Sequence, residues 1–106
     1  MSEEKFAKLL EDVKNHLDIT WTDEEGRGGE KLSGMIKRSM DRLDEIAGEE
    51  LDYEAEAKPR ELLFNRVMYD RSGALDDFAK NYSSDLVGLR IGKQVERYAE
   101  DKEQKL

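Results

Sequence analysis

The sequence predicts an all-α fold, a small bundle of about four helices. Three observations favour it. Apolar residues recur at helical spacing, the only proline stands where a helix would begin, and glycines end or interrupt the periodic segments. At 106 residues the chain has the length of one domain. Charged residues make up 42% of it, so much of the surface must be charged and solvated.

The first helix is expected from about Glu3 to Leu17, where apolar residues follow the spacing of one helix face. A second helix is expected from about Gly29 to Ala47, and Gly48 is suited to end it in the left-handed conformation. Between these helices we expect a flexible acidic loop, residues 18–29, which holds the only tryptophan, Trp21.

The longest and most apolar segment, about 59–82, predicts a long central helix that begins at the proline. Most of its apolar side chains share one broad face of the helical projection, but Leu62 and Tyr69 fall on the opposite side. A single core of this size cannot cover both faces. We therefore expect Leu62 and Tyr69 to be buried only in an assembly.

The segment 85–91, DLVGLRI, predicts a short helix that presents Leu86 and Leu89, although its β-branched residues leave a strand open. The residues that follow are highly charged and predict a tail or a marginal helix. The chain thus divides into a helical domain, residues 1–91, and a charged C-terminal tail, residues 92–106.

The charge and composition exclude several classes of function. Acidic side chains number 26 and basic ones 18, which gives a net charge of −8. Such a surface repels nucleic acid and anionic membranes, so we expect no general nucleic-acid or membrane partner. The absence of cysteine excludes disulfides, thiol nucleophiles and cysteine-ligated zinc. No apolar segment is long enough to span a bilayer or to form a signal peptide, so we expect a soluble protein.

The acidic loop does not match a known ligand-binding pattern. Counted from Asp18, an EF-hand would need glycine and glutamate at the positions that Asp23 and Gly29 occupy. The glycine-rich run 26–29 lacks the Lys-Ser/Thr of a phosphate-binding loop and follows three carboxylates. We therefore expect a helix connection that holds neither a metal nor a cofactor.

No combination of nucleophile, base and oxyanion donor is evident in the chain. His16 is the only histidine, and adjacent acids such as Asp76 and Asp77 do not face each other on a helix. We expect no enzymatic activity and no catalytic residue. An enzyme with an unrecognised carboxylate site is a weaker alternative.

Two interpretations apply to Trp21: a lid folded over the helix ends, or an exposed aromatic anchor for another protein, since tryptophan is enriched in interface hot spots. Two interpretations also apply to the stretch with Leu86, Leu89, Arg90 and Ile91. It either completes the core of the monomer or forms a surface that is buried in an assembly.

Three segments, in order, carry a resemblance to a known family. They are LLEDVKNHLDIT before an acidic turn, KLSGMIKRSMDRLDEIAGEELDY, and PRELLFNRVMYDRSGALDDFAKNYSSDLVGLRI, which closes with Leu89-Arg90. This order, over roughly 9–91, resembles the head–tail connector (adaptor, or head-completion) proteins of tailed bacteriophages. The run 26–29 is looser than the tight link of that family, and the tail after residue 91 lies outside the resemblance.

The resemblance implies a helical subunit that assembles into a ring, commonly of twelve copies, beneath the portal of the capsid. Such rings extend the DNA channel without binding DNA specifically, and they dock neck, stopper or tail-completion proteins. The family is structural and needs no cofactor, and its subunits can be monomers in solution. The expected location is the head–tail interface of the virion, and the host cytoplasm during assembly.

The charge fits this expectation, because acidic side chains that line a ring lumen would let DNA slide past. A closed ring also needs two different, complementary surfaces on each subunit. The alternative is an acidic helical inhibitor that imitates nucleic acid and binds a basic protein. That protein would be a monomer or dimer with a regularly spaced stripe of acids, and its binding would be sensitive to salt.

Overall fold

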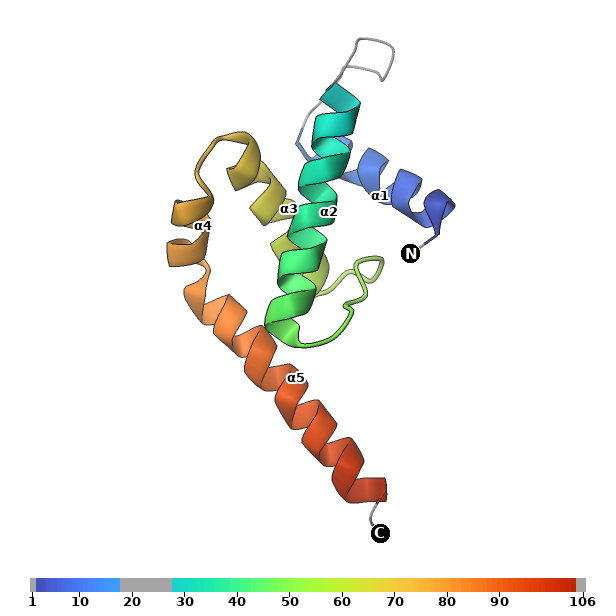
Figure 1. Cartoon of the computed structure of the whole chain (residues 1–106), viewed down its shortest axis with the longest axis vertical. Helices are drawn as coiled ribbons and strands as arrows, with labels where there is room; N and C mark the ends of the chain where they lie inside the picture. The colour runs from blue at the N-terminus through green and yellow to red at the C-terminus, as the bar shows by residue number, and fades with distance from the viewer. Residues whose placement is uncertain (1, 18–27, 105–106) are drawn as a thin grey trace.

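The computed structural model describes residues 2–17 and 28–104, and within these ranges every regular element is an α-helix. The prediction of a small all-α bundle is confirmed. Five helices follow one another in the described part of the chain (Figure 1): α1 (Glu3–His16), α2 (Gly28–Ala47), α3 (Lys58–Arg71), α4 (Leu75–Asn81) and α5 (Ser83–Gln104). The expected loop with Trp21 lies outside the described residues.

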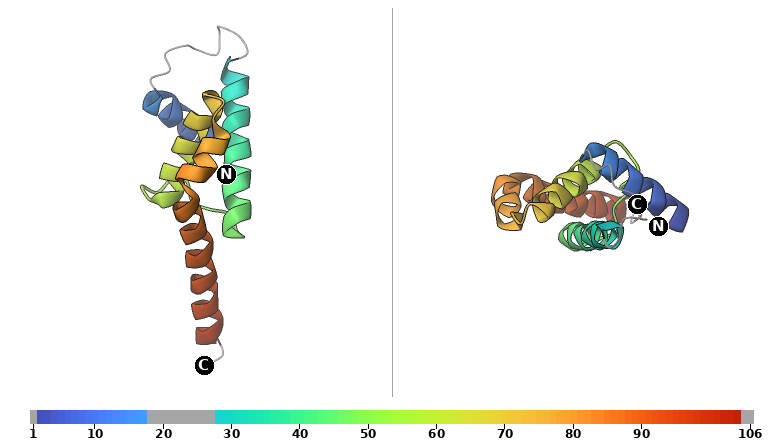
Figure 2. Two further views of the ribbon diagram at one scale, coloured as in Figure 1. Left: turned by 90° about the vertical axis from the view of Figure 1, so that its left-hand side faces the viewer. Right: turned by 90° about the horizontal axis from the view of Figure 1, so that it is seen from above.

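The core forms where α2 and α3 cross. Its buried apolar side chains come mainly from these two helices, with contributions from α1, α4 and the connector between α2 and α3: Leu9, Val13, Leu32, Ile36, Leu43, Tyr53, Leu62, Leu63, Phe64, Val67 and Phe78. Each large apolar side chain contributes about 1.5–3 kcal/mol when fully buried. α1 and the connector lie on one side of α2, and α4 and the start of α5 lie on the other (Figures 1 and 2).

The ends of the first two helices follow from local sequence. The Ser2 hydroxyl accepts a hydrogen bond from the Lys5 backbone N–H at 3.2 Å, which satisfies one of the free donors of the first turn of α1. Gly48 has a φ of 80°, and its N–H donates to the Asp44 carbonyl at 2.8 Å. The prediction that Gly48 ends the second helix is therefore confirmed.

The predicted long helix over 59–82 is instead two helices, α3 and α4, separated by a turn at residues 72–74. Gly73 has a φ of 69°, and the Ala74 N–H donates to the Tyr69 carbonyl at 2.8 Å. Glycine adopts this left-handed conformation without steric cost, so the helix ends there although the apolar periodicity continues.

The expectation that Leu62 is exposed in the monomer is wrong, because its side chain is 0% exposed. The turn at Gly73 brings α4 and the start of α5 back beside α3. There the half-buried Tyr69 packs against Phe78 and Tyr82, with ring centres 5.8 and 5.9 Å apart. The side of α3 that a single long helix would leave uncovered is therefore covered within the chain.

The stretch 85–91 and the segment after it form one continuous helix, α5, so the helical alternative holds for both segments and the strand and the irregular tail do not. The boundary expected between residues 91 and 92 falls inside this helix. The second half of α5 extends beyond the other helices (Figure 2). The radius of gyration is accordingly 15.6 Å, against about 13 Å for a compact domain of this size.

Tyr53 anchors the connector, residues 48–57, to α2. Its side chain is buried, and its hydroxyl lies 2.6 Å from an Asp44 carboxylate oxygen and 3.0 Å from the Met40 carbonyl oxygen. The same Asp44 oxygen accepts a hydrogen bond from the Leu51 N–H at 3.0 Å. Burial, reinforced by the hydrogen bond and the charge of Asp44, raises the pKa of Tyr53 far above its usual range.

We predict that Tyr53→Phe lowers the free energy of unfolding by about 1–3 kcal/mol at neutral pH, because Asp44 loses a donor in a partly buried site. Urea unfolding measures the change. The matched control is Tyr98→Phe, whose ring is 69% exposed, and which should unfold like the parent protein.

We also predict that the difference in stability between the parent protein and Tyr53→Phe depends on pH. The folded-state pKa of Tyr53 lies above its ordinary value of 10.0, so its contribution to stability is full below pH 10 and falls as the pH rises further, by up to about 1.4 kcal/mol per pH unit. The difference in unfolding free energy between the parent and Tyr53→Phe should therefore shrink above about pH 10. A difference that stays constant there would contradict the protonated, buried Tyr53.

Candidate interaction surfaces

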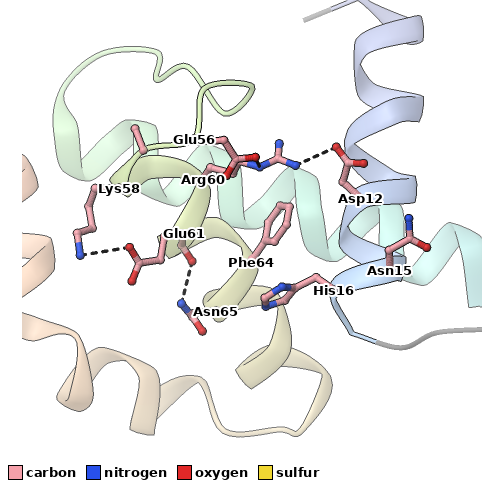
Figure 3. A pocket seen from close by; sticks show the side chains of 10 residues that line it. Asp12, Asn15, His16, Glu56, Lys58, Arg60, Glu61, Phe64 and Asn65 are labelled. Atoms are coloured by element: carbon pink, nitrogen blue, oxygen red, sulfur yellow. Dashed lines mark hydrogen bonds and ion pairs between the residues drawn. The ribbon is translucent and has the colours of Figure 1, made fainter.

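Arg60 joins α1, the connector and α3 (Figure 3). Its guanidinium lies 2.8 Å from an Asp12 carboxylate oxygen and donates to the Tyr53 carbonyl at 3.0 Å. A third contact, at 3.5 Å, reaches Glu56, and the group stacks 4.7 Å from the centre of the Phe64 ring. The side chains of Arg60 and Asp12 are only 14% and 31% exposed, so their ion pair is partly shielded from water and holds α1 in place. The contact with Glu56 is open to water, because the Glu56 side chain is 91% exposed.

An open hollow of about 650 Å³ surrounds this arginine, between the end of α1 and the start of α3. His16 lies on its wall with its ring centre 5.1 Å from that of Phe64. Among the residues that the structure describes, the lining includes no hydroxyl or thiol side chain, and Glu61 pairs with Lys58 at 3.4 Å. The contacts around Arg60 and Glu61 are those of a structural junction, and these described lining residues include no nucleophile next to a base.

No group of three or more histidine, aspartate and glutamate side chains could hold a metal ion among the residues that the structure describes. In the same residues, no helix is both long and apolar enough to cross a membrane.

An exposed apolar row runs along the outer face of α5, and we call it the α5 stripe: Val87, Ile91, Val95 and Tyr98. Their side chains are 55%, 53%, 60% and 69% exposed. Intervals of four, four and three residues place the four side chains on one side of the helix. Four large apolar side chains in one exposed row are typical of a protein contact surface rather than of a solvated helix.

The inner face of α5 is the one that packs on the bundle. Leu86 and Leu89 are partly buried against the core. Further along, the Arg97 guanidinium donates hydrogen bonds of 3.4 Å to the carbonyl oxygens of Ala47 and Gly48. These carbonyls at the C-terminal end of α2 have no acceptor role within the helix itself, and the positive charge of Arg97 suits this end of the helix dipole. The α5 stripe faces away from these contacts, and residues 2–17 and 28–104 leave it exposed.

A second apolar surface lies between α1, α2 and the connector, and we call it the α1–α2 groove. It is an open groove of about 520 Å³ with apolar side chains on its floor and charged ones along its rim. The floor includes Phe6, Ala7, Leu10, Met40 and Leu51. The exposed rim includes Glu3, Asp41, Glu50 and Lys37, and the half-buried Asp44, which is bonded to Tyr53, also lines the groove. The Lys37 ammonium lies 5.1 Å from the centre of the Phe6 ring, as in a cation–π contact.

Positive charge gathers on another side of α2. Arg66 of α3 donates to the buried Ser39 hydroxyl at 2.8 Å. Burial lowers the pKa of Arg66; Asp70 opposes this effect, and the nearby Arg42 and Arg38 add to it. Three arginines thus lie close together in a chain whose net charge is −8.

The expected interface residues therefore separate into groups. Arg90 and Ile91 are exposed on α5, whereas Leu86, Leu89 and Tyr69 are partly buried by contacts within the chain. Leu62 is in the core, as described above, and Trp21 lies outside the described residues.

Sequence reasoning missed the α5 stripe as a unit. Val87 lies before the expected boundary at residue 91, and Val95 and Tyr98 lie after it. The helical spacing of these residues continues across that boundary, and this spacing is the sequence signal that predicts one continuous apolar face.

Comparisons of this chain with protein-family models, with curated proteins and with solved structures gave no match.

We predict that Arg60→Lys lowers the free energy of unfolding by about 1–3 kcal/mol, because a lysine cannot reach Asp12 and the Tyr53 carbonyl at the same time. Chemical unfolding followed by circular dichroism measures the loss. Lys58→Ala removes an exposed cation of the same hollow and should leave the stability nearly unchanged. Equal stability of Arg60→Lys and the parent protein would contradict the role of Arg60 as a junction.

We also predict that replacing two stripe residues in one protein, Ile91→Ser with Val95→Ser, changes the free energy of unfolding by less than about 1 kcal/mol at low protein concentration. Leu89→Ser, on the inner face, should cost about 1–3 kcal/mol because it removes a side chain packed on the core. Thermal unfolding at micromolar concentration compares them. Equal losses for the two proteins would mean that the α5 stripe is packed in the monomer.

Proposed function

We propose that this protein is a structural subunit of a ring of the head–tail connector kind, seated beneath the portal of a tailed-phage capsid. The ring extends the DNA channel and provides a docking surface for neck or tail-completion proteins. The observation that carries the proposal is the α5 stripe, four large apolar side chains that stay more than half exposed on a projecting helix. The resemblance in segment order, over roughly 9–91, supplies the kind of assembly.

The α5 stripe supports assembly on physical grounds. A monomeric protein rarely keeps a contiguous apolar row in water, because covering it in a contact is favourable. The stripe also contributes little to the folded subunit, since its side chains point away from the core. A surface that the fold does not need, and that water does not favour, is best explained by another protein chain that covers it.

The net charge of −8 supports a channel through which DNA passes. DNA carries about one negative charge per 1.7 Å of its axis, and a basic lumen would hold it. Exposed acids gather in the connector, at Glu49, Glu50, Asp52, Glu54 and Glu56. We propose that part of this acidic surface lines the lumen, and an assembled ring with a neutral or basic lumen would contradict that assignment.

The alternative, an acidic inhibitor that imitates nucleic acid, needs a continuous acidic face. The exposed Arg38 and Arg42, close to Arg66, interrupt such a face along α2. The apolar stripe is also unlike a surface that binds a basic protein mainly through charge.

We predict that electron microscopy of this protein mixed with candidate portal rings will show added density with the symmetry of the portal. Persistent monomers beside bare portals would contradict the proposal. The Ile91→Ser, Val95→Ser protein is the control, and it should form fewer rings although it folds normally. Tight, salt-sensitive binding to a basic DNA-binding enzyme would favour the inhibitor instead.

A further inference from the structure

We propose that the α5 stripe of one subunit docks in the α1–α2 groove of a second copy of this chain. This inference rests on the proposed ring and names the two surfaces that close it. A stripe on one subunit and a groove on the next form a head-to-tail contact. Contacts of this kind repeat from subunit to subunit and produce a closed ring when the rotation closes.

The two surfaces match in length. Val87 and Tyr98 mark the ends of the stripe, and they lie eleven residues apart on one helix. Ser33 and Asp44 mark the ends of the groove along α2, and they are also eleven residues apart. At about 1.5 Å per residue, both spans are about 16 Å long. The apolar row of α5 is therefore as long as the segment of α2 that lines the groove.

The edges of the two surfaces are complementary in charge. The rim of the groove carries three exposed carboxylates, Glu3, Asp41 and Glu50, and one lysine. One edge of the stripe carries the exposed Arg90. An acidic rim that faces Arg90 favours this pairing.

The other edge of the stripe carries Gly88 and Gly92. A Cβ atom added at either glycine would meet no atom within 4 Å, so the backbone of α5 is open to close approach at this edge. Glycine lets a neighbouring helix wall come nearer than any side chain would.

The α5 stripe of a subunit does not reach the groove of the same subunit. The groove uses Lys37, Asp41 and Asp44 of α2, whereas Arg90 and Arg97 of the same chain approach a different side of α2, near Ile46. If two α5 helices paired in antiparallel fashion, the Arg90 edge of one helix would face the Arg90 edge of the other, and the two positive charges would repel each other. It would also leave the groove uncovered.

Disulfide trapping tests the contact, because the chain has no cysteine of its own. Val95→Cys places a thiol on the stripe, and Ala7→Cys places one on the floor of the groove. Ala79→Cys, on the exposed side of α4, is the matched control. All three positions are exposed, and circular dichroism verifies that each variant folds. Equal amounts of two variants are mixed at high concentration under mild oxidation, and the mixed dimers are quantified.

We expect the Val95→Cys and Ala7→Cys proteins to form mixed dimers at least about tenfold faster than Val95→Cys with Ala79→Cys, because docking raises the effective concentration of the two thiols. Adding Arg90→Glu to the stripe variant should slow the reaction severalfold, since it places an acid against the acidic rim. Faster pairing of Val95→Cys with itself would overturn the proposal in favour of an α5–α5 contact. Equal rates for all pairs would also overturn it.

The outcomes separate this inference from the proposed function. Fast stripe-to-groove trapping without added density on any portal would contradict the connector while the contact holds. Added density on a portal, from a ring in which Val95→Cys and Ala7→Cys are not trapped, would contradict the contact while the connector holds.

Discussion

The packing of α2 against α3 is the interaction on which the rest of the structure depends. Their facing leucine, isoleucine and valine side chains form the centre of the core, and α1, α4 and α5 each dock on one or both of these helices. Hydrophobic residues are only 37% of the chain, so the apolar surface available for docking is limited. α5 packs on the bundle through its inner face, and its outer face stays exposed.

Two polar anchors determine the shape of the α1–α2 groove. Tyr53 fixes the connector to α2 through Asp44, and Arg60 fixes both α1 and the connector to α3. Tyr53 and Asp44 themselves line the groove, and with Arg60 they position two of its three walls. A loss of either anchor should therefore change the groove as well as the stability of the fold.

Much of the fold could be predicted because its signals are local. Capping at Ser2, the apolar spacing of the first two helices and the glycine at 48 all act within one or two helical turns. The turn at Gly73 could not be predicted from spacing, because the apolar pattern continues through it. The contacts of Tyr69 with Phe78 and Tyr82 followed from that turn. The groove could not be predicted either, because it joins three segments that are distant in the sequence and becomes a surface only after α1 docks.

Hydrogen exchange, measured at low and high protein concentration, tests the central claim that the stripe and the groove cover each other between copies. Backbone amides in 87–100 and in 3–10 should become more protected together as the concentration rises, while those of α4 should not change. Protection that stays constant in both segments, or that rises in α5 alone, would contradict the head-to-tail contact.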